Sequence, residues 1–319
     1  MAGVTLAVDL NGVRLPTPVL GASGCFGSGR ELAEVMDIRK VGGIVTKSVT
    51  ARPVKGMPTP RMVETPSGML NSIGLQNPGI KEFMHKEGAF LGRVGVPVIV
   101  SIAGKSVEEY VQVAAEVHKM KGVVAIEANI SCPNVERRNQ VFACHPDSAG
   151  EVIGAVARLS RLPVFAKLTP DVTDIVEVAG ACVRAGAHGL SLINTLLGMA
   201  IDLDTFTPKL GGVTGGLSGP AIRPVAVRAV YQVSQAFPEV PILGMGGIRS
   251  AADAIEFLLA GAWAVEIGTA NFFDPNVTID VANGIGEFLA ERGLRSPADL
   301  RGRAVPPGGE VDEPAYRSG

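Results

Sequence analysis

Eight short apolar runs recur along the chain, and each ends in small or polar residues. They span residues 18–24, 43–49, 97–104, 124–133, 164–170, 189–195, 241–247 and 264–270. Between them, residues 107–120, 175–185, 221–237 and 251–260 carry apolar side chains three or four positions apart, which is typical of amphipathic helices. Strands that are apolar throughout and alternate with helices predict a parallel sheet covered on both faces. Eight such units in roughly 250 residues predict an α/β fold, the (β/α)8 TIM barrel.

Three segments lie outside this alternation. Residues 5–15 predict an N-terminal hairpin that turns at Asn11-Gly12 and closes the bottom of the barrel. Long insertions at residues 50–78 and 196–216 follow the second and sixth predicted strands, where we expect lids or substrate walls. We find no domain boundary, and we predict one barrel domain over residues 1–300 with a polar C-terminal tail over residues 301–319.

Composition and charge exclude several classes of function. The formal net charge is −2 and there is no basic run, so the chain has no electrostatic footprint for nucleic acid. No apolar stretch reaches the roughly 18 residues of a membrane span, and no signal peptide opens the chain. The four cysteines are dispersed, which argues against a metal or iron–sulfur site built from this chain alone. These features predict a cytoplasmic protein with free thiols that binds neither membranes nor nucleic acid.

The fourth strand ends in the most informative stretch, Asn129-Ile130-Ser131-Cys132-Pro133-Asn134. Pro133 has no backbone N–H, so the strand should stop there and leave the thiol of Cys132 between two carboxamides. A carboxamide is an uncharged donor and acceptor, which suits a substrate that carries amide or imide groups. The alternative interpretation is that Cys132 is only a small buried apolar residue.

The other strands also end in polar residues or glycines, and in a barrel these ends converge on one cavity. Gly246-Gly247 after strand seven and Gly268-Thr269 after strand eight expose backbone N–H groups, which predicts a phosphate site, although a glycine pair alone could be only a tight turn. Lys47 and Lys167 end two strands; each could stabilise negative charge on a cofactor, bind a substrate carboxylate, form a Schiff base, or simply pair with a carboxylate.

These motifs together resemble the flavin-dependent dihydroorotate dehydrogenases of the cysteine-type class 1. The matching stretches run in family order over roughly residues 5–290: residues 46–48, 71–79, 129–134, 194–195, 215–220, 246–247 and 268–269. Residues 56–61, 68–71 and 194–199 look more like the NAD-linked subclass 1B than the fumarate-using subclass 1A.

The resemblance implies an FMN across the barrel mouth and dihydroorotate or orotate beside it. The flavin phosphate would lie at Gly246, Gly247, Gly268 and Thr269, and its ring system at Ala22, Ser23, Lys47, Ser48, Ser101, Asn129, Lys167, Ile193 and Gly219. The substrate would contact Lys47, Asn71, Ser72, Ile73, Gly74, Leu75, Asn129, Asn134, Asn194 and Thr195. Cys132 would take the C5 proton as general base, and Lys167 would stabilise charge on the reduced flavin.

The resemblance also implies partners. Subclass 1B relatives form a homodimer core joined by a subunit that carries FAD and [2Fe–2S], giving a heterotetramer that passes electrons to NAD⁺. The chain lacks a nicotinamide fingerprint of its own, in line with that division. Two departures from the family stand out. Ser101 takes a position that is often asparagine, and residues 135–144 lack the usual glycine pair.

Other interpretations of the same residues remain open. A fumarate-linked class 1A enzyme and a dihydropyrimidine dehydrogenase-like enzyme share the cysteine and flavin chemistry. A Schiff-base aldolase would use Lys167 as nucleophile, but it leaves Cys132 without a role. A barrel that only binds a partner is a further alternative, and flavin absorbance would separate it and the aldolase from the dehydrogenases.

Overall fold

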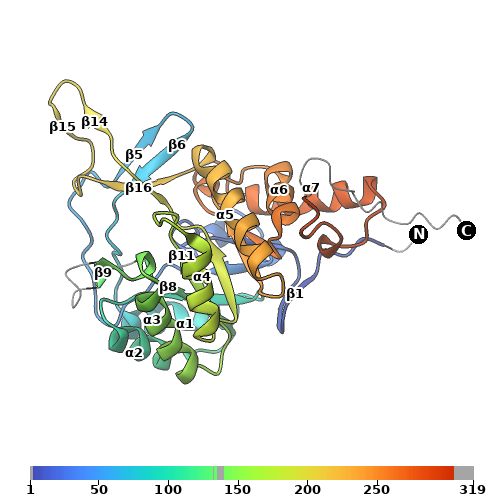
Figure 1. Ribbon diagram of the computed structural model, residues 1–319, viewed down its shortest axis with the longest axis horizontal. Helices are drawn as coiled ribbons and strands as arrows, with labels where there is room; N and C mark the ends of the chain where they lie inside the picture. The colour runs from blue at the N-terminus through green and yellow to red at the C-terminus, as the bar shows by residue number, and fades with distance from the viewer. Residues whose placement is uncertain (1–2, 132, 135–139, 305–319) are drawn as a thin grey trace, which may run out of the picture.

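The computed structural model describes residues 3–131, 133–134 and 140–304; at residues 133, 134, 140 and 141 the description covers the backbone alone. Eight parallel strands form the closed barrel that the sequence predicts (Figure 1). In barrel order they are β3 (Val19–Gly21), β4 (Gly43–Val45), β7 (Val98–Ile102), β8 (Val123–Asn129), β11 (Val164–Leu168), β12 (Gly189–Leu192), β17 (Ile242–Met245) and β18 (Ala264–Ile267). Ile267 of β18 lies opposite Gly21 of β3, which closes the ring.

Helices cover the outside of the barrel. They are α1 (Ile80–Leu91), α2 (Val107–Val117), α3 (Pro146–Leu159), α4 (Ile175–Arg184), α5 (Arg223–Ala236), α6 (Ala251–Ala260) and α7 (Val277–Glu291). The first unit differs from the regular pattern, because β3 is followed by two short 3₁₀ helices, η1 (Leu32–Glu34) and η2 (Ile38–Lys40). Three glycines with positive φ in residues 24–29 favour turns over an α-helix there.

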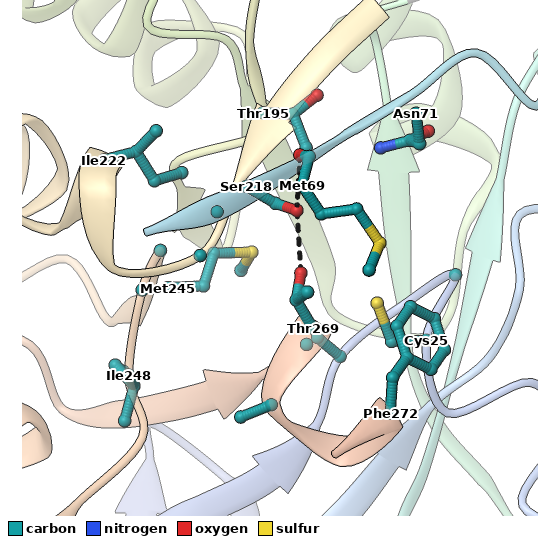
Figure 2. Close-up of a pocket in the computed structure, with 18 of the residues that line it drawn as sticks. Cys25, Met69, Asn71, Thr195, Ser218, Ile222, Met245, Ile248, Thr269 and Phe272 are labelled. Atoms are coloured by element: carbon teal, nitrogen blue, oxygen red, sulfur yellow. Dashed lines mark hydrogen bonds between the residues drawn. The ribbon is translucent and has the colours of Figure 1, made fainter. Parts of the chain in front are cut away.

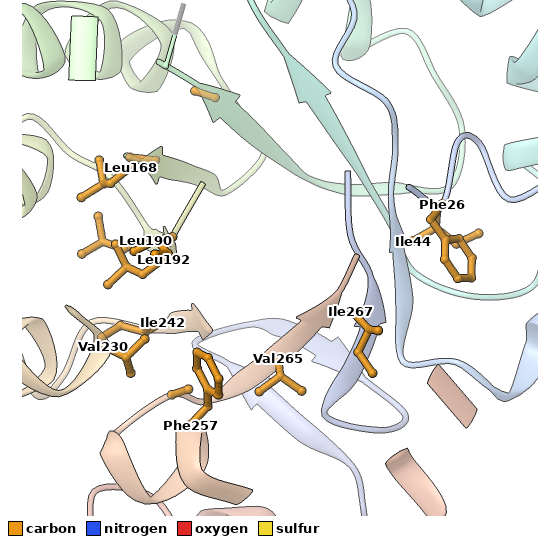
Figure 3. Close-up of a cluster of buried hydrophobic side chains, with 14 of the residues drawn as sticks. Phe26, Ile44, Leu168, Leu190, Leu192, Val230, Ile242, Phe257, Val265 and Ile267 are labelled. Atoms are coloured by element: carbon orange, nitrogen blue, oxygen red, sulfur yellow. The ribbon is translucent and has the colours of Figure 1, made fainter. Parts of the chain in front are cut away.

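The main core lies between the strands and the helices. Figure 3 shows part of it, with Val230 and Phe257 from the helices packed beside strand residues such as Ile242 and Val265. Burying each such side chain contributes about 1.5–3 kcal/mol, so this layer is the main source of stability. Gly244 is required for this packing, because a Cβ there would lie 2.7 Å from the Phe257 ring.

A second core fills the lower barrel, and the predicted hairpin closes it. Strands β1 (Val8–Leu10) and β2 (Val13–Leu15) are joined by Asn11 and Gly12, both at positive φ as a tight hairpin turn requires. Leu10, Val13 and Leu15 are almost fully buried against interior residues of the barrel.

The two long insertions combine into one small sheet. It contains β5 (Met62–Thr65) and β6 (Gly68–Asn71) from the first insertion, and β13 (Leu196–Gly198) and β16 (Gly215–Ser218) from the second, in the order β13-β16-β6-β5. A further hairpin, β14 (Ile201–Asp202) and β15 (Thr207–Pro208), projects at the upper left of Figure 1. The short pair β9 (Pro133–Asn134) and β10 (Gln140–Val141), η3 (Phe142–Cys144), η4 (Pro220–Ile222), η5 (Thr269–Phe272) and η6 (Pro297–Asp299) complete the elements of the described residues.

None of the helices within the described ranges is long and apolar enough to cross a bilayer. The predicted boundary between a barrel domain and a tail at residue 300 stays a prediction, because residues 305–319 lie outside the described part of the chain.

Candidate active site

A cavity of about 920 Å³ opens at the carboxyl ends of the barrel strands. The small insertion sheet forms part of its wall through Met62, Met69 and Asn71, as expected for substrate walls. The volume of the cavity is at the upper end of the range for pockets that bind small molecules and cofactors.

Most of the residues predicted from the sequence meet in this cavity. Those predicted for the cofactor that line it are Ala22, Ser23, Lys47, Ser48, Asn129, Lys167, Ile193, Gly219, Gly246, Gly247, Gly268 and Thr269. Those predicted for the substrate that line it are Asn71, Ile73, Gly74, Leu75, Asn129, Asn194, Thr195 and Lys47. Ser72 and Ser101 are described but do not line the cavity. Cys132 lies outside the described residues, as does the side chain of Asn134, so their predicted roles stay predictions.

One end of the cavity is built from glycines and a helix N-terminus. Gly246 and Gly247 have φ values of +130° and +79°, and a Cβ on Gly247 would lie 2.7 Å from the Gly219 carbonyl oxygen. The turn leads into α6, whose N-cap Ser250 accepts a hydrogen bond from the backbone N–H of Asp253. Because backbone N–H groups and the helix dipole converge here, this end is suited to an anion.

A row of hydroxyl groups connects this end to the insertion sheet. Figure 2 shows Thr269 donating a hydrogen bond to Ser218 at 2.8 Å, while Ser218 donates to the Met69 carbonyl oxygen at 3.2 Å. Cys25 and Phe272 line the same region, although neither was predicted from the sequence. Burial raises the pKa of the Cys25 thiol, although Lys167 and Lys47 oppose that shift.

The opposite end is rich in hydroxyl and carboxamide groups that hold one another in place. Asn129 Nδ2 donates to Ser48 Oγ at 3.1 Å, and Asn194 Nδ2 donates to Asn129 Oδ1 at 3.3 Å. The backbone carbonyl of Asn129 accepts a 2.7 Å hydrogen bond from the buried Tyr110 hydroxyl. The two carboxamides are therefore fixed in orientation before any ligand binds.

Ser101 belongs to the layer below the cavity. It is fully buried, its hydroxyl lies 2.9 Å from Ser48 Oγ, and it donates to Glu127 Oε1 at 3.1 Å. Ser101 therefore does not line the cavity, and its predicted contact with a flavin stays a prediction.

The lysine at the end of β11 is paired with a carboxylate, one of the alternatives that the sequence left open. Lys167 Nζ lies 3.5 Å from Glu127 Oε1, and both side chains are almost completely buried. Burial alone would lower the pKa of Lys167, but the Glu127 and Glu266 carboxylates outweigh it and raise that pKa. Lys167 is consequently a permanent cation at the cavity floor.

Neither acid is among the residues that were predicted from the sequence. Glu127 and Glu266 lie within apolar strands, and a charged residue inside such a run was the signal that could have revealed them. Glu266 lines the cavity and is 1 % exposed. Burial raises the pKa of Glu266 well above its ordinary value, and Glu127 raises it further, while Lys167 opposes the shift.

Comparison with known proteins agrees with this geometry. The family model described as dihydroorotate dehydrogenase matches residues 5–289. The chain is 52 % identical over 302 residues to the protein of Geotalea daltonii named dihydroorotate dehydrogenase B (NAD(+)), catalytic subunit, covering 95 % of this chain and 99 % of the relative. It is 51 % identical over 297 residues to the protein of the same name from Halalkalibacterium halodurans, covering 93 % and 97 % of the two chains.

Proposed function

This chain belongs to the dihydroorotate dehydrogenase family, and from that premise we propose that it oxidises dihydroorotate to orotate in pyrimidine biosynthesis as the catalytic subunit of an NAD-linked enzyme. The observation that carries the proposal is that a glycine-rich anion site, a cluster of asparagines and two lysines line one and the same cavity. The first feature suits a phosphate-bearing cofactor. The second suits a small ring that carries imide and carboxylate groups.

The residues present fit a flavin mononucleotide. A Cβ on Gly247 would lie 2.7 Å from the Gly219 carbonyl oxygen, and Gly247 has a positive φ, so the turn that leads into the N-terminus of α6 requires glycine there. Gly246, Gly247, Gly268 and Thr269 would hold the phosphate. The ring system would be held by Ala22, Ser23, Lys47, Ser48, Asn129, Lys167, Ile193 and Gly219. When bound, the flavin supplies the acceptor for the hydride that leaves C6 of the substrate.

The chain itself would bind the substrate and move one proton. Lys47 would pair with the substrate carboxylate, and Asn71, Asn129 and Asn194 would exchange hydrogen bonds with its imide groups. Cys132, as a thiolate, would take the proton from C5 while the C6 hydrogen leaves with its electron pair. The positive charge of Lys167 would stabilise the negative charge on the reduced flavin.

We also propose a partner. The relatives' shared name, catalytic subunit, supports a second subunit that links this chain to NAD⁺. We expect that subunit to carry FAD and a [2Fe–2S] cluster and to join a homodimer of this chain in a heterotetramer.

Anaerobic stopped-flow reduction tests the reaction. Dihydroorotate should bleach the flavin of the isolated chain, and Cys132→Ala should keep the flavin and bind orotate yet slow the bleaching by about 10²–10⁴-fold. Because an ordinary thiol titrates near pH ~8.5, the wild-type rate should rise with pH, and Cys132→Ser should retain some activity at higher pH. Cys132→Ala bleaching at the wild-type rate would exclude the proposed base.

Two further measurements separate the alternatives. Acid extraction should release FMN rather than FAD. Artificial dyes should reoxidise the isolated chain while NAD⁺ should not, and fast turnover with fumarate would instead indicate a class 1A enzyme. Bleaching by dihydrouracil in place of dihydroorotate would favour a dihydropyrimidine-oxidising enzyme.

A further inference from the structure

Three charged side chains lie inside the barrel at the floor of the cavity, and two of them, Lys167 and Glu266, line it. Glu127 of β8, Lys167 of β11 and Glu266 of β18 are 0 %, 5 % and 1 % exposed. Each follows by two positions a residue of the inner apolar core, namely Ala125, Phe165 and Ala264. Since side chains alternate along a strand, all three point into the barrel and form one charged layer above that core.

The contacts within this charged layer are unequal. Glu127 Oε1 has two partners, the Lys167 ammonium at 3.5 Å and the Ser101 hydroxyl at 3.1 Å. By contrast, Glu127 Oε2 and both carboxyl oxygens of Glu266 are buried without a hydrogen-bond partner among the described residues. One ammonium can balance only one carboxylate, so a second ionised carboxylate would leave a net buried negative charge.

Among the described residues, Lys167 is the cation that is almost completely buried with the two acids. Next to Glu266, β17 contributes Met245 and β3 contributes Leu20, while β12 contributes Ser191. The other nearby titratable groups are Cys25, in the loop after β3, and Lys47, which follows β4. Lys47 also comes two positions after an inner-core residue, Val45, but it is only partly buried and lines the cavity.

We propose that Glu266 carries a proton in the resting protein, so that Glu127 and Glu266 together act as positioning residues that hold Lys167 as a cation in a neutral layer under the bound flavin. The flavin part of this inference rests on the proposed function. Glu127 is the counter-ion, and Glu266 stores the proton. Were Glu266 ionised, its charge would oppose the arrival of electrons in the cavity that it lines.

Infrared spectroscopy of the full-length, oxidised protein tests the stored proton without substrate. At neutral pH the exposed carboxyl groups are ionised, so the carbonyl stretch of a protonated carboxyl group would report this site. We expect that band in the wild type, its loss in Glu266→Gln, and its retention in Glu64→Gln, an exposed acid at the cavity rim. A wild type without the band, or a band that survives Glu266→Gln, would overturn the assignment.

Glu127→Gln provides a second variant if Glu266→Gln does not fold. With the counter-ion neutralised, Glu266 should take its place beside Lys167 and release its proton, so this variant should lose the band as well. A band that persists in Glu127→Gln would show that the two acids do not exchange roles, which contradicts the neutral layer. The wild-type band should also disappear as the pH is raised.

The midpoint potential of the bound flavin tests the positioning role. At acidic and neutral pH, wild type and Glu266→Gln should have the same potential, because both side chains are uncharged. Above the pH at which the infrared band disappears, reduction of the wild type should take up one additional proton, so its potential should fall more steeply than that of Glu266→Gln. Equal slopes would overturn the coupling to the cavity. Failure of dihydroorotate to reduce the flavin would refute the proposed function but leave the infrared result intact.

Discussion

Replacing Lys167 with methionine would keep an unbranched side chain but remove the ammonium that balances Glu127. The carboxylate is fully buried, and Lys167 Nζ is its charged neighbour at 3.5 Å. Without it, the folded protein should bind a proton at Glu127 that the unfolded chain releases. Holding that proton costs about 1.4 kcal/mol for each pH unit above the ordinary glutamate pKa of about 4.3. At pH 7 this amounts to about 3.7 kcal/mol, within the about 3–5 kcal/mol expected when one partner of a buried pair is removed.

The sign of the pH dependence distinguishes this cause from simple loss of packing. Where the folded state binds more protons than the unfolded state, the free energy of unfolding falls as pH rises. The free energy of unfolding of Lys167→Met should therefore be close to that of the wild type near pH 5, and the difference between them should grow steadily up to pH 7. Lys167 also opposes the raised pKa of Glu266, so its removal adds to the same fall, and a variant that additionally lacks the Glu127 charge is needed to separate the two acids.

Urea denaturation of the flavin-free chain provides the assay. The chain has one tryptophan, Trp263, which stacks on Arg301 at 3.7 Å and reports unfolding of the barrel through its fluorescence. The matched control is Lys167→Met combined with Glu127→Gln, which removes both charges and should lose the additional pH dependence. If Lys167→Met differs from the wild type by the same free energy at pH 5 and pH 7, the ion-pair argument is refuted.

Three further predictions concern other parts of the molecule. Tyr110→Phe should lower the free energy of unfolding by about 1 kcal/mol and weaken orotate binding, because it removes the hydrogen bond that fixes Asn129; denaturation and ligand titration would measure both. Gly247→Ala should release flavin on dialysis, because the new Cβ would lie 2.7 Å from a carbonyl oxygen at a positive φ, whereas Gly88→Ala, in open space on α1, should retain it. Burial raises the pKa of Cys182 to about 12, so mass spectrometry should find this thiol unmodified after native alkylation at pH 8 and modified only after unfolding.

The barrel could be predicted from the sequence because each of its units carries its own local signal. A strand buried on both faces must be apolar along its length, and β7 and β11 are fully buried throughout. The hairpin was equally predictable, since Asn11 and Gly12 are the residues that accept its positive φ values. The irregular first unit was not predicted, because short 3₁₀ helices have no long periodic pattern.

The pairing of the two insertions into one sheet could not be predicted from the sequence either, and the reason is different. Asn71 of β6 lies opposite Gly216 of β16, and these residues are 145 positions apart in the chain. Antiparallel strands pair through backbone hydrogen bonds, which are the same for any side chain. The sequence of one segment therefore does not indicate which other segment it pairs with. The same pairing places Asn71 at the cavity wall, and residues of the insertion sheet such as Met62 and Met69, which line the same wall, were not predicted from the sequence.

The two buried acids, Glu127 and Glu266, could not be predicted from sequence motifs. Residues at strand ends were predicted as site residues because the rim of a barrel is known to carry chemistry, and Lys167 was found in that way. Glu127 and Glu266 lie within the strands, where side chains are expected to be apolar and to pack in the core. Their carboxylates nevertheless keep the neighbouring Lys167 charged. A cation at a buried rim position requires a counter-charge within a few ångströms, and period-two alternation limits its source to inward-facing positions of the strands. Searching those positions for acids once Lys167 had been chosen would have revealed both, so the physical requirement of charge balance extends a prediction further than any motif does.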